Sequence, residues 1–146
     1  MLSTYPINAI YDMTYSNQLT TNFPKDLVIE PTQNSPFMKY SFKNKTLTIV
    51  GSSFMENAHD YYEPFLSKVY DDLMSKNHAN VELYFTSFGP KTAKMLFEFF
   101  GNLRTFNQTG KTVEVLWKAN EEDENMAELG ISFAELFDLN IKIVHS

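Results

Sequence analysis

The residues of this chain best placed to do chemistry are the hydroxyls of the segment Tyr84–Thr92, YFTSFGPKT. An apolar strand pattern runs into Thr86 and Ser87, and a Gly-Pro step then precedes a long amphipathic helix. Proline suits the first helical position, where its missing N–H is no loss, and Gly89 permits the tight turn before it. The spacing therefore predicts Thr86, Ser87 and Thr92 around the positive end of a helix, where free N–H groups receive an anion or a phosphate carried by a hydroxyl. Capping is the alternative, because Ser and Thr are the usual N-cap residues.

Other kinds of chemistry find little support in the sequence. No HExxH pair, Walker loop or GxGxxG motif occurs, and Ser87 lacks the GxSxG setting of a nucleophile. The acidic run Glu121–Glu124 lacks the spacing and the glycine of a calcium loop. It favours a solvated helix start, because acidic side chains there complement the helix dipole. An acidic edge that docks a partner is the alternative. We therefore predict no catalytic residue, no metal site and no cofactor, and a protein that is not an enzyme. A ligand pocket among the many Phe and Tyr is a weaker alternative, because aromatic stripes at helical spacing usually form core.

Composition narrows the class of protein. The chain has 146 residues, of which 43% are hydrophobic and 15% aromatic, which is enough for one domain with a single core. Its net charge of −6 opposes binding to nucleic acid and to anionic membrane surfaces. There is no cysteine, no signal-peptide pattern and no apolar run long enough to span a bilayer, so we expect a cytoplasmic protein without disulfides.

Hydrophobic periodicity predicts an α/β domain. Residues 1–25 have no period and are interpreted as an N-terminal tail, either disordered or docked on a single domain over 26–146, with Pro31 and Pro36 bracketing a linker-like approach. The predicted order is β-β-α-β-α-β-α-β in a mixed sheet flanked by helices. Strands are expected over 37–42, 46–51, 80–86, 111–118 and 140–145, and helices over about 61–74, 90–107 and 120–138.

Three details of this pattern bear on the structure. Pro64 predicts either a regular helix that starts near Tyr61 or a bent first turn. The apolar run Leu83–Phe85 predicts a central strand buried on both faces. In the last helix the inward residues are expected to be Met126, Leu129, Phe133, Leu136 and Phe137.

Three segments, in order and at near-constant spacing, resemble the SiaC-type bacterial regulatory phosphoproteins. MENAHDYYEPFLSKVYDDLMSK is similar to the family segment PEN-x-x-x-FYEPL…WL, and VELYFTSFGPKTAKMLFEFF resembles KLEYFNTSSSKxLLDIL. The ending VEVLWKANEEDENMAELGISFAELFDLNIKIV resembles V-W-YYEEDDEDMLEAGEDYAELVDLPF. The resemblance covers about residues 27–145.

The resemblance implies a fold and a function. The fold is expected to be similar to the anti-sigma-factor antagonists of the STAS class, a central sheet flanked by helices. The function is expected to be that of a non-enzymatic switch. In this family a dedicated protein kinase phosphorylates a Thr at the helix start, and a metal-dependent protein phosphatase removes the phosphate. The unphosphorylated form binds and stimulates a diguanylate cyclase, which links the switch to cyclic-di-GMP and biofilm formation.

The resemblance also implies where the phosphate goes, although the segment departs from the family pattern. Counted without gaps from Tyr84, the acceptor position falls on Ser87, while Thr86 takes the place of the family Asn. If Lys94 is aligned with the family Lys instead, three extra residues precede the helix and Thr92 comes near the family Ser positions, which makes it the third candidate. Because of this departure, a constitutive protein-binding scaffold that has lost the switch is the alternative function.

Partner contacts are expected on both sides of the acceptor segment. Glu56 and Asn57 keep the residues of the family PEN motif, although Met55 replaces its proline. At the start of the helix that follows the acceptor segment, the candidates are Gly89, Lys91 and Lys94.

Overall fold

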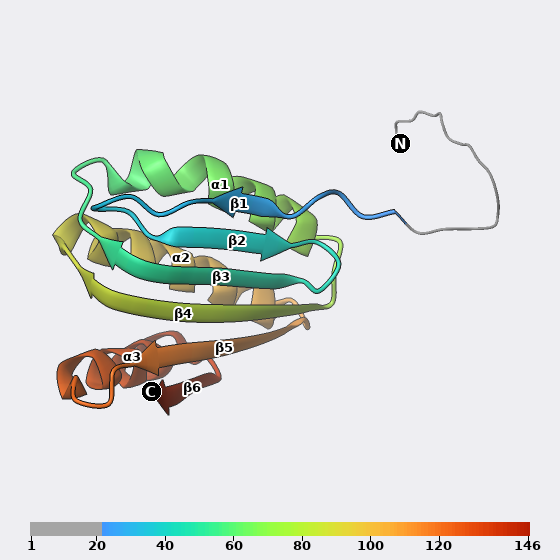
Figure 1. Ribbon diagram of the computed structural model, residues 1–146. Coiled ribbons are helices and arrows are strands. Elements are labelled where there is room, and N and C mark those ends of the chain that lie inside the picture. Colours follow the sequence, from blue (N-terminus) through green and yellow to red (C-terminus); the bar gives the residue numbers. More distant parts are fainter. Residues whose placement is uncertain (1–21) are drawn as a thin grey trace.

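The computed structural model describes residues 22–146, so most of the predicted tail, residues 1–21, lies outside the described residues. Six strands and three helices alternate much as the periodicity predicts (Figure 1). Within residues 22–146, no helix is both long and apolar enough to cross a membrane. The elements are β1 (Leu27–Ile29), β2 (Phe37–Ser41), β3 (Thr46–Ser53), α1 (Ala58–Leu73), β4 (His78–Phe88), α2 (Pro90–Gln108), β5 (Thr112–Ala119), α3 (Glu124–Phe137) and β6 (Ile141–His145).

The strands form one mixed sheet in the order β1-β2-β3-β4-β5-β6. Strands β1 to β3 pair antiparallel, and β3 to β6 pair parallel, so the predicted mixed α/β sheet is confirmed. Strand β1 was not predicted, because three residues are too short to show a period. Its register comes instead from pairing with β2, where Val28 lies opposite Lys39.

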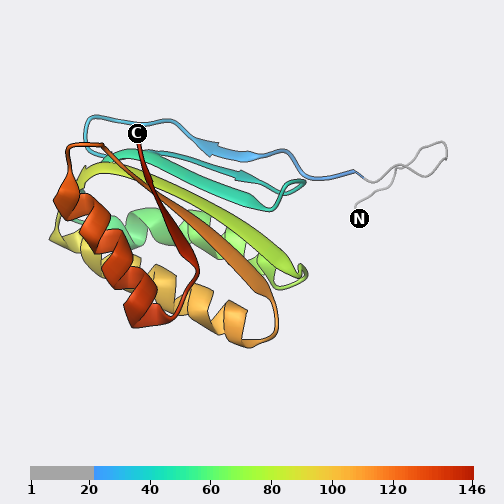
Figure 2. The ribbon, with the colours of Figure 1, turned by 90° about the horizontal axis from the view of Figure 1, so that it is seen from below.

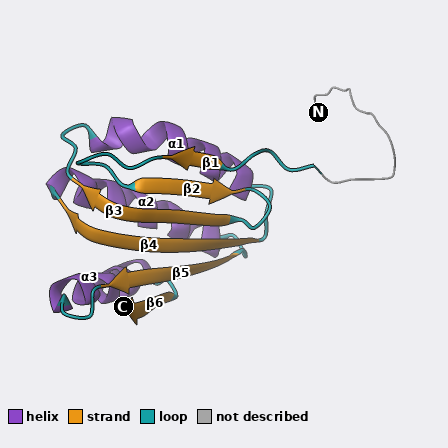
Figure 3. Ribbon diagram, viewed as in Figure 1, coloured by secondary structure: helices purple, strands orange, loops and turns teal. Residues whose placement is uncertain are grey.

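All three helices cover the same face of the sheet, and within residues 22–146 no element covers the other face, here called the open face (Figures 2 and 3). Strand β4 lies between β3 and β5, as predicted for a central strand. Leu83 and Phe85 are buried in the core, but Tyr84 between them is only half-buried. The predicted burial of this strand on both faces is therefore wrong, because none of the three described helices covers the face that carries Tyr84.

Helix α1 begins at Ala58 and continues regularly past Pro64. The start near Tyr61 is therefore wrong by one turn. A proline in the seventh position removes one hydrogen bond near the helix start. The helix persists because its inward face is buried in the core, through Ala58, Tyr62, Phe65, Leu66, Val69 and Leu73.

Helix α3 approaches β5 closely because Gly130 has no side chain. An added Cβ there would lie 2.5 Å from Trp117 Cδ1 and 2.7 Å from Ile143 Cδ1. The indole of Trp117 is buried, and its Nε1 donates to the carbonyl of Met126 at 2.9 Å. The close approach buries the row of α3 that contains Gly130 and Phe133, which leaves Leu136 57% exposed. The expectation that Leu136 points inward is therefore wrong.

Replacing Gly130 with alanine tests this close approach. We expect Gly130→Ala to lower the free energy of unfolding by about 1 to 3 kcal/mol, because the new methyl overpacks the indole of Trp117. Gly101→Ala in α2 is the matched control, since its Cβ would meet only Phe137 Cε1 at 3.9 Å. That substitution should be neutral or stabilising by up to about 1 kcal/mol through helix propensity. Urea unfolding of both variants measures the difference, and equal values would contradict the packing described.

Candidate functional site

A β-bulge brings three hydroxyls together at the carboxyl ends of β3 and β4. Gly51 pairs with Phe85, but the next residue, Ser52, pairs with Ser87, so Thr86 is the extra residue of the bulge. Ser52 Oγ consequently lies 2.9 Å from Thr86 Oγ1 and 3.4 Å from Ser87 Oγ. Thr86 is exposed and Ser87 half-buried, so both predicted hydroxyls reach the surface of the domain.

Thr92 occupies a different environment, because it is fully buried with 0% exposure. Its hydroxyl lies 2.6 Å from Ser53 Oγ and donates to the Ser53 carbonyl at 3.1 Å. Ser53 Oγ also lies 2.7 Å from the hydroxyl of Tyr62, and burial raises the pKa of that phenol well above its usual range. This buried triad of Ser53, Tyr62 and Thr92 joins the end of β3 to α1 and α2.

The start of α2 has the predicted Gly-Pro geometry but not the alternative of a hydroxyl cap. Pro90 is the first helical residue, and the N-cap Gly89 makes no side-chain hydrogen bond. Its backbone N–H donates to the carbonyl of Ser53 at 2.9 Å, which fixes the helix start against β3. The ring of Phe54, 50% exposed, lies over Gly89, where an added Cβ would be 3.2 Å from Phe54 Cδ1. The neighbouring hydroxyls therefore do not cap helix α2.

A shallow pocket of about 380 Å³ opens beside Thr86. Tyr84, Asn120, Glu122 and Asp123 are among its lining residues, which include two carboxylates and no basic residue. Asp123 is also the N-cap of α3, where its carboxylate accepts from Met126 N at 3.1 Å. The acidic run therefore begins a helix, as predicted, and also places negative charge next to Thr86.

The predicted partner-contact residues gather between the starts of α1 and α2. Glu56, Asn57, Lys91 and Lys94 line a pocket of about 440 Å³ there. Gly89 lies apart from this pocket, under the ring of Phe54. All four pocket residues are exposed, so this surface presents both signs of charge to an approaching protein.

His59, on the same surface, is half of an exposed pair with Glu98, at 3.2 Å from Nδ1 to Oε1. Exposed pairs of this kind contribute little to stability. Within residues 22–146, no group of three or more His, Cys, Asp or Glu side chains is placed to hold a metal ion.

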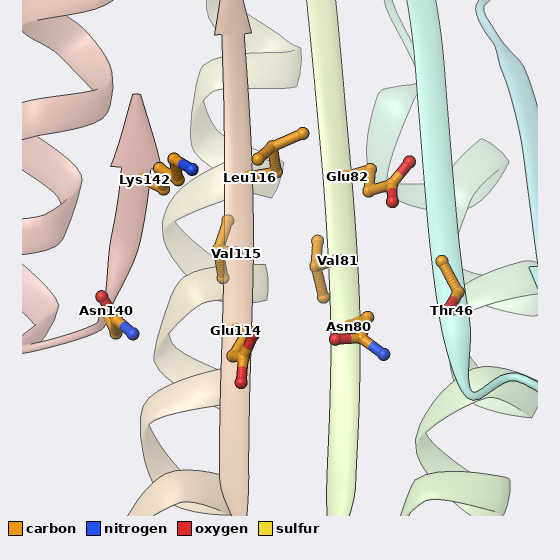
Figure 4. Close-up of a pocket in the computed structure, with 9 residues that line it drawn as sticks. All are labelled: Thr46, Asn80, Val81, Glu82, Glu114, Val115, Leu116, Asn140 and Lys142. Atoms are coloured by element: carbon orange, nitrogen blue, oxygen red, sulfur yellow. The ribbon is translucent and has the colours of Figure 1, made fainter. Parts of the chain in front are cut away.

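The open face of the sheet carries a wider hollow of about 510 Å³ (Figure 4). The side chains across it come from four parallel strands and include Glu82, Glu114 and Lys142. None of the predicted site residues lines it. The residues that do line the hollow carry charges of both signs on an open surface, which indicates a solvated face rather than a substrate pocket.

The arrangement presents a cluster of hydroxyls, from Ser52, Thr86 and Ser87, at the surface of the domain. Ser52, Ser53 and Phe54, which shape the site, were missed in the sequence. The available signal was the Ser-Ser pair at the end of one predicted strand, which mirrors Thr86 and Ser87 at the end of the next. Because parallel strands bring their carboxyl ends together, that pairing could have been expected.

The chain is thus a small α/β domain with a cluster of surface hydroxyls at the carboxyl edge of its sheet. A family model described as SiaC family regulatory phosphoprotein matches residues 29–146. This protein belongs to that family. A search of curated protein sequences gives no match.

Solved structures of similar fold come from the same family. The crystal structure of apo-SiaC from Pseudomonas aeruginosa superposes with a TM-score of 0.75 at 22% identity, over 83% of this chain and 99% of that chain. SiaC in the complex of the diguanylate cyclase SiaD with its activator SiaC, from the same organism, gives a TM-score of 0.78 at 22% identity. That match covers 83% of this chain and 100% of the other. The further likeness to STAS-class anti-sigma-factor antagonists stays a prediction.

The buried triad predicts a specific loss of stability. Thr92→Val keeps the shape of the side chain but removes a hydroxyl that bonds to Ser53. We expect the free energy of unfolding to fall by about 1 to 3 kcal/mol, because buried polar atoms of Ser53 lose a partner. Thr105→Val, at an exposed position of the same helix, is the control and should change stability by less than about 0.5 kcal/mol. Urea unfolding checks both, and a neutral Thr92→Val would show that the triad contributes nothing.

Proposed function

We propose that this protein is a non-enzymatic partner switch whose unphosphorylated form binds and stimulates a diguanylate cyclase. In this proposal a dedicated kinase phosphorylates Ser87 or Thr86, and a metal-dependent phosphatase removes the phosphate. One observation carries the proposal: in a chain of the SiaC family, two surface hydroxyls lie on a bulge immediately before an uncapped helix start. The complex of SiaC with the cyclase SiaD supports the choice of partner.

Electrostatics explain how such a site would act as a switch. A phosphate adds about −1.5 to −2 charge and three acceptor oxygens. In the free protein the positive end of α2 offsets part of this charge. In a complex, a partner packed over the surface hydroxyls would have to desolvate the dianion. Binding is therefore expected to weaken on phosphorylation.

The three candidate hydroxyls are not equivalent as phosphoacceptors. A kinase must bring the hydroxyl in line with the γ-phosphorus of ATP, which requires access. Thr86 and Ser87 meet this condition, whereas Thr92 is buried against Ser53. We propose that Thr92 has a structural role in the folded protein.

The partner surface is proposed to include both sides of the acceptor segment. One pocket is lined by Glu56, Asn57, Lys91 and Lys94. In the sequence, Gly89 lies between the bulge and the two lysines. A cytoplasmic location fits this function, because the kinase draws on ATP. The alternative function is a constitutive scaffold of the same fold, which the unusual TSFGP segment supports.

Acidic substitutions separate the switch from the scaffold. We expect Ser87→Asp or Thr86→Asp to weaken binding to the cognate diguanylate cyclase by about tenfold or more, because a charge enters the docking surface. Thr112→Asp adds the same charge at the opposite end of the sheet and should leave binding unchanged. Surface plasmon resonance against the cyclase measures the three affinities.

Phosphorylation itself needs a direct measurement. After incubation with the cognate kinase and ATP, mass spectrometry should find one phosphate on the peptide that contains Thr86 and Ser87. No phosphate on Ser87, Thr86 or Thr92 would rule out the switch. Unchanged cyclase binding by both acidic variants would favour the scaffold.

A further inference from the structure

The hydroxyl of Ser52 lies within hydrogen-bond distance of both candidate acceptors. Its Oγ lies 2.9 Å from Thr86 Oγ1 and 3.4 Å from Ser87 Oγ, although Ser52 is more than thirty residues away in sequence. A Ser hydroxyl has one proton and can donate it to a phosphate oxygen, and such a charge-assisted bond is stronger than a neutral one. Ser52 is therefore placed to hold a phosphate on either neighbour.

The surroundings of the two acceptors differ in charge. Thr86 lines the pocket that also contains Glu122 and Asp123, whereas Ser87 is not among the residues of that pocket. Two carboxylates beside a phosphate disfavour its dianionic form. The charged side chains at the starts of α1 and α2, namely Glu56, Asp60, Lys91 and Lys94, line the separate pocket of about 440 Å³.

We propose that Ser52 is the positioning residue of the phosphorylation site and that Glu122 and Asp123 direct the phosphate to Ser87 rather than Thr86. In the unmodified protein, the bond between Ser52 and Thr86 holds the Thr86 hydroxyl against β3. After phosphoryl transfer to Ser87, with the Ser87 proton leaving and ADP released, the hydroxyl of Ser52 donates to the new phosphate. This inference deepens the proposed function and depends on it for its biological meaning.

The test uses the folded protein alone, so that no partner is needed. Phosphoserine at position 87 and phosphothreonine at position 86 are each incorporated during translation, and the phosphate is titrated by ³¹P NMR. Each is compared with the same phosphorylated residue in a short unstructured peptide. We expect the phosphate on Thr86 to have a raised second pKa, because Thr86 shares a pocket with the two carboxylates and Ser87 does not line it. The second pKa of the phosphate on Ser87 should be lower by about 0.5 or more.

Substitutions then assign the effect to named side chains. Ser52→Ala should raise the phosphate pKa at position 87, and Ser52→Thr should restore it, because threonine keeps the donor. Glu122→Gln should lower the phosphate pKa at position 86 and leave that at position 87 unchanged. Ser75→Ala, which removes an exposed hydroxyl just after α1, is the control and should affect neither.

The titrations decide whether Ser52 and the two carboxylates have the proposed roles. If the two phosphates titrate alike, or if Ser52→Ala leaves the phosphate at position 87 unaffected, the roles of Ser52 and the carboxylates are wrong. That result would leave the switch itself standing if Ser87→Asp still weakens cyclase binding. Conversely, the expected titrations with unchanged cyclase binding would support the site preference and reject the switch.

Discussion

The arrangement of the site depends on the buried triad of Ser53, Tyr62 and Thr92. It ties the last residue of β3 to helices α1 and α2, and the Ser53 carbonyl also accepts from the N–H of Gly89. One residue therefore sets the position of both helix starts relative to the sheet edge. Buried hydroxyls must be paired to avoid a desolvation cost, so these contacts are specific in a way that apolar packing is not.

The positions of the surface hydroxyls are set by the same end of strand β3. Because successive residues of a strand point to opposite faces, Ser53 turns toward the helices while Ser52 turns toward Thr86 and Ser87. The bulge adds one residue to β4 and so brings two hydroxyls to Ser52 instead of one. A buried triad and a cluster of surface hydroxyls are thus adjacent in the chain, an arrangement that suits the proposed phosphorylation site because buried contacts hold its geometry.

Much of the fold was predictable because the apolar periods are long. The alternation of strands and helices and the mixed sheet both follow from pattern alone. The errors have local causes. Strand β1 is too short for a period, α1 tolerates Pro64 because its inward face is buried, and Leu136 is exposed because Gly130 brings a different row of α3 against the sheet.

The sequence by itself determined the family, the α/β class and the segment that carries the candidate hydroxyls, because these depend on residue types and on spacing along the chain. Only the tertiary structure distinguished the hydroxyls from one another. Thr86, Ser87 and Thr92 look interchangeable near a helix start, yet the first two reach the surface and the third is buried. The reason is physical: burial, and the contact of Thr86 with Ser52, are set by strand pairing between residues far apart in sequence, and the pattern along one strand does not specify the register of that pairing or its bulge.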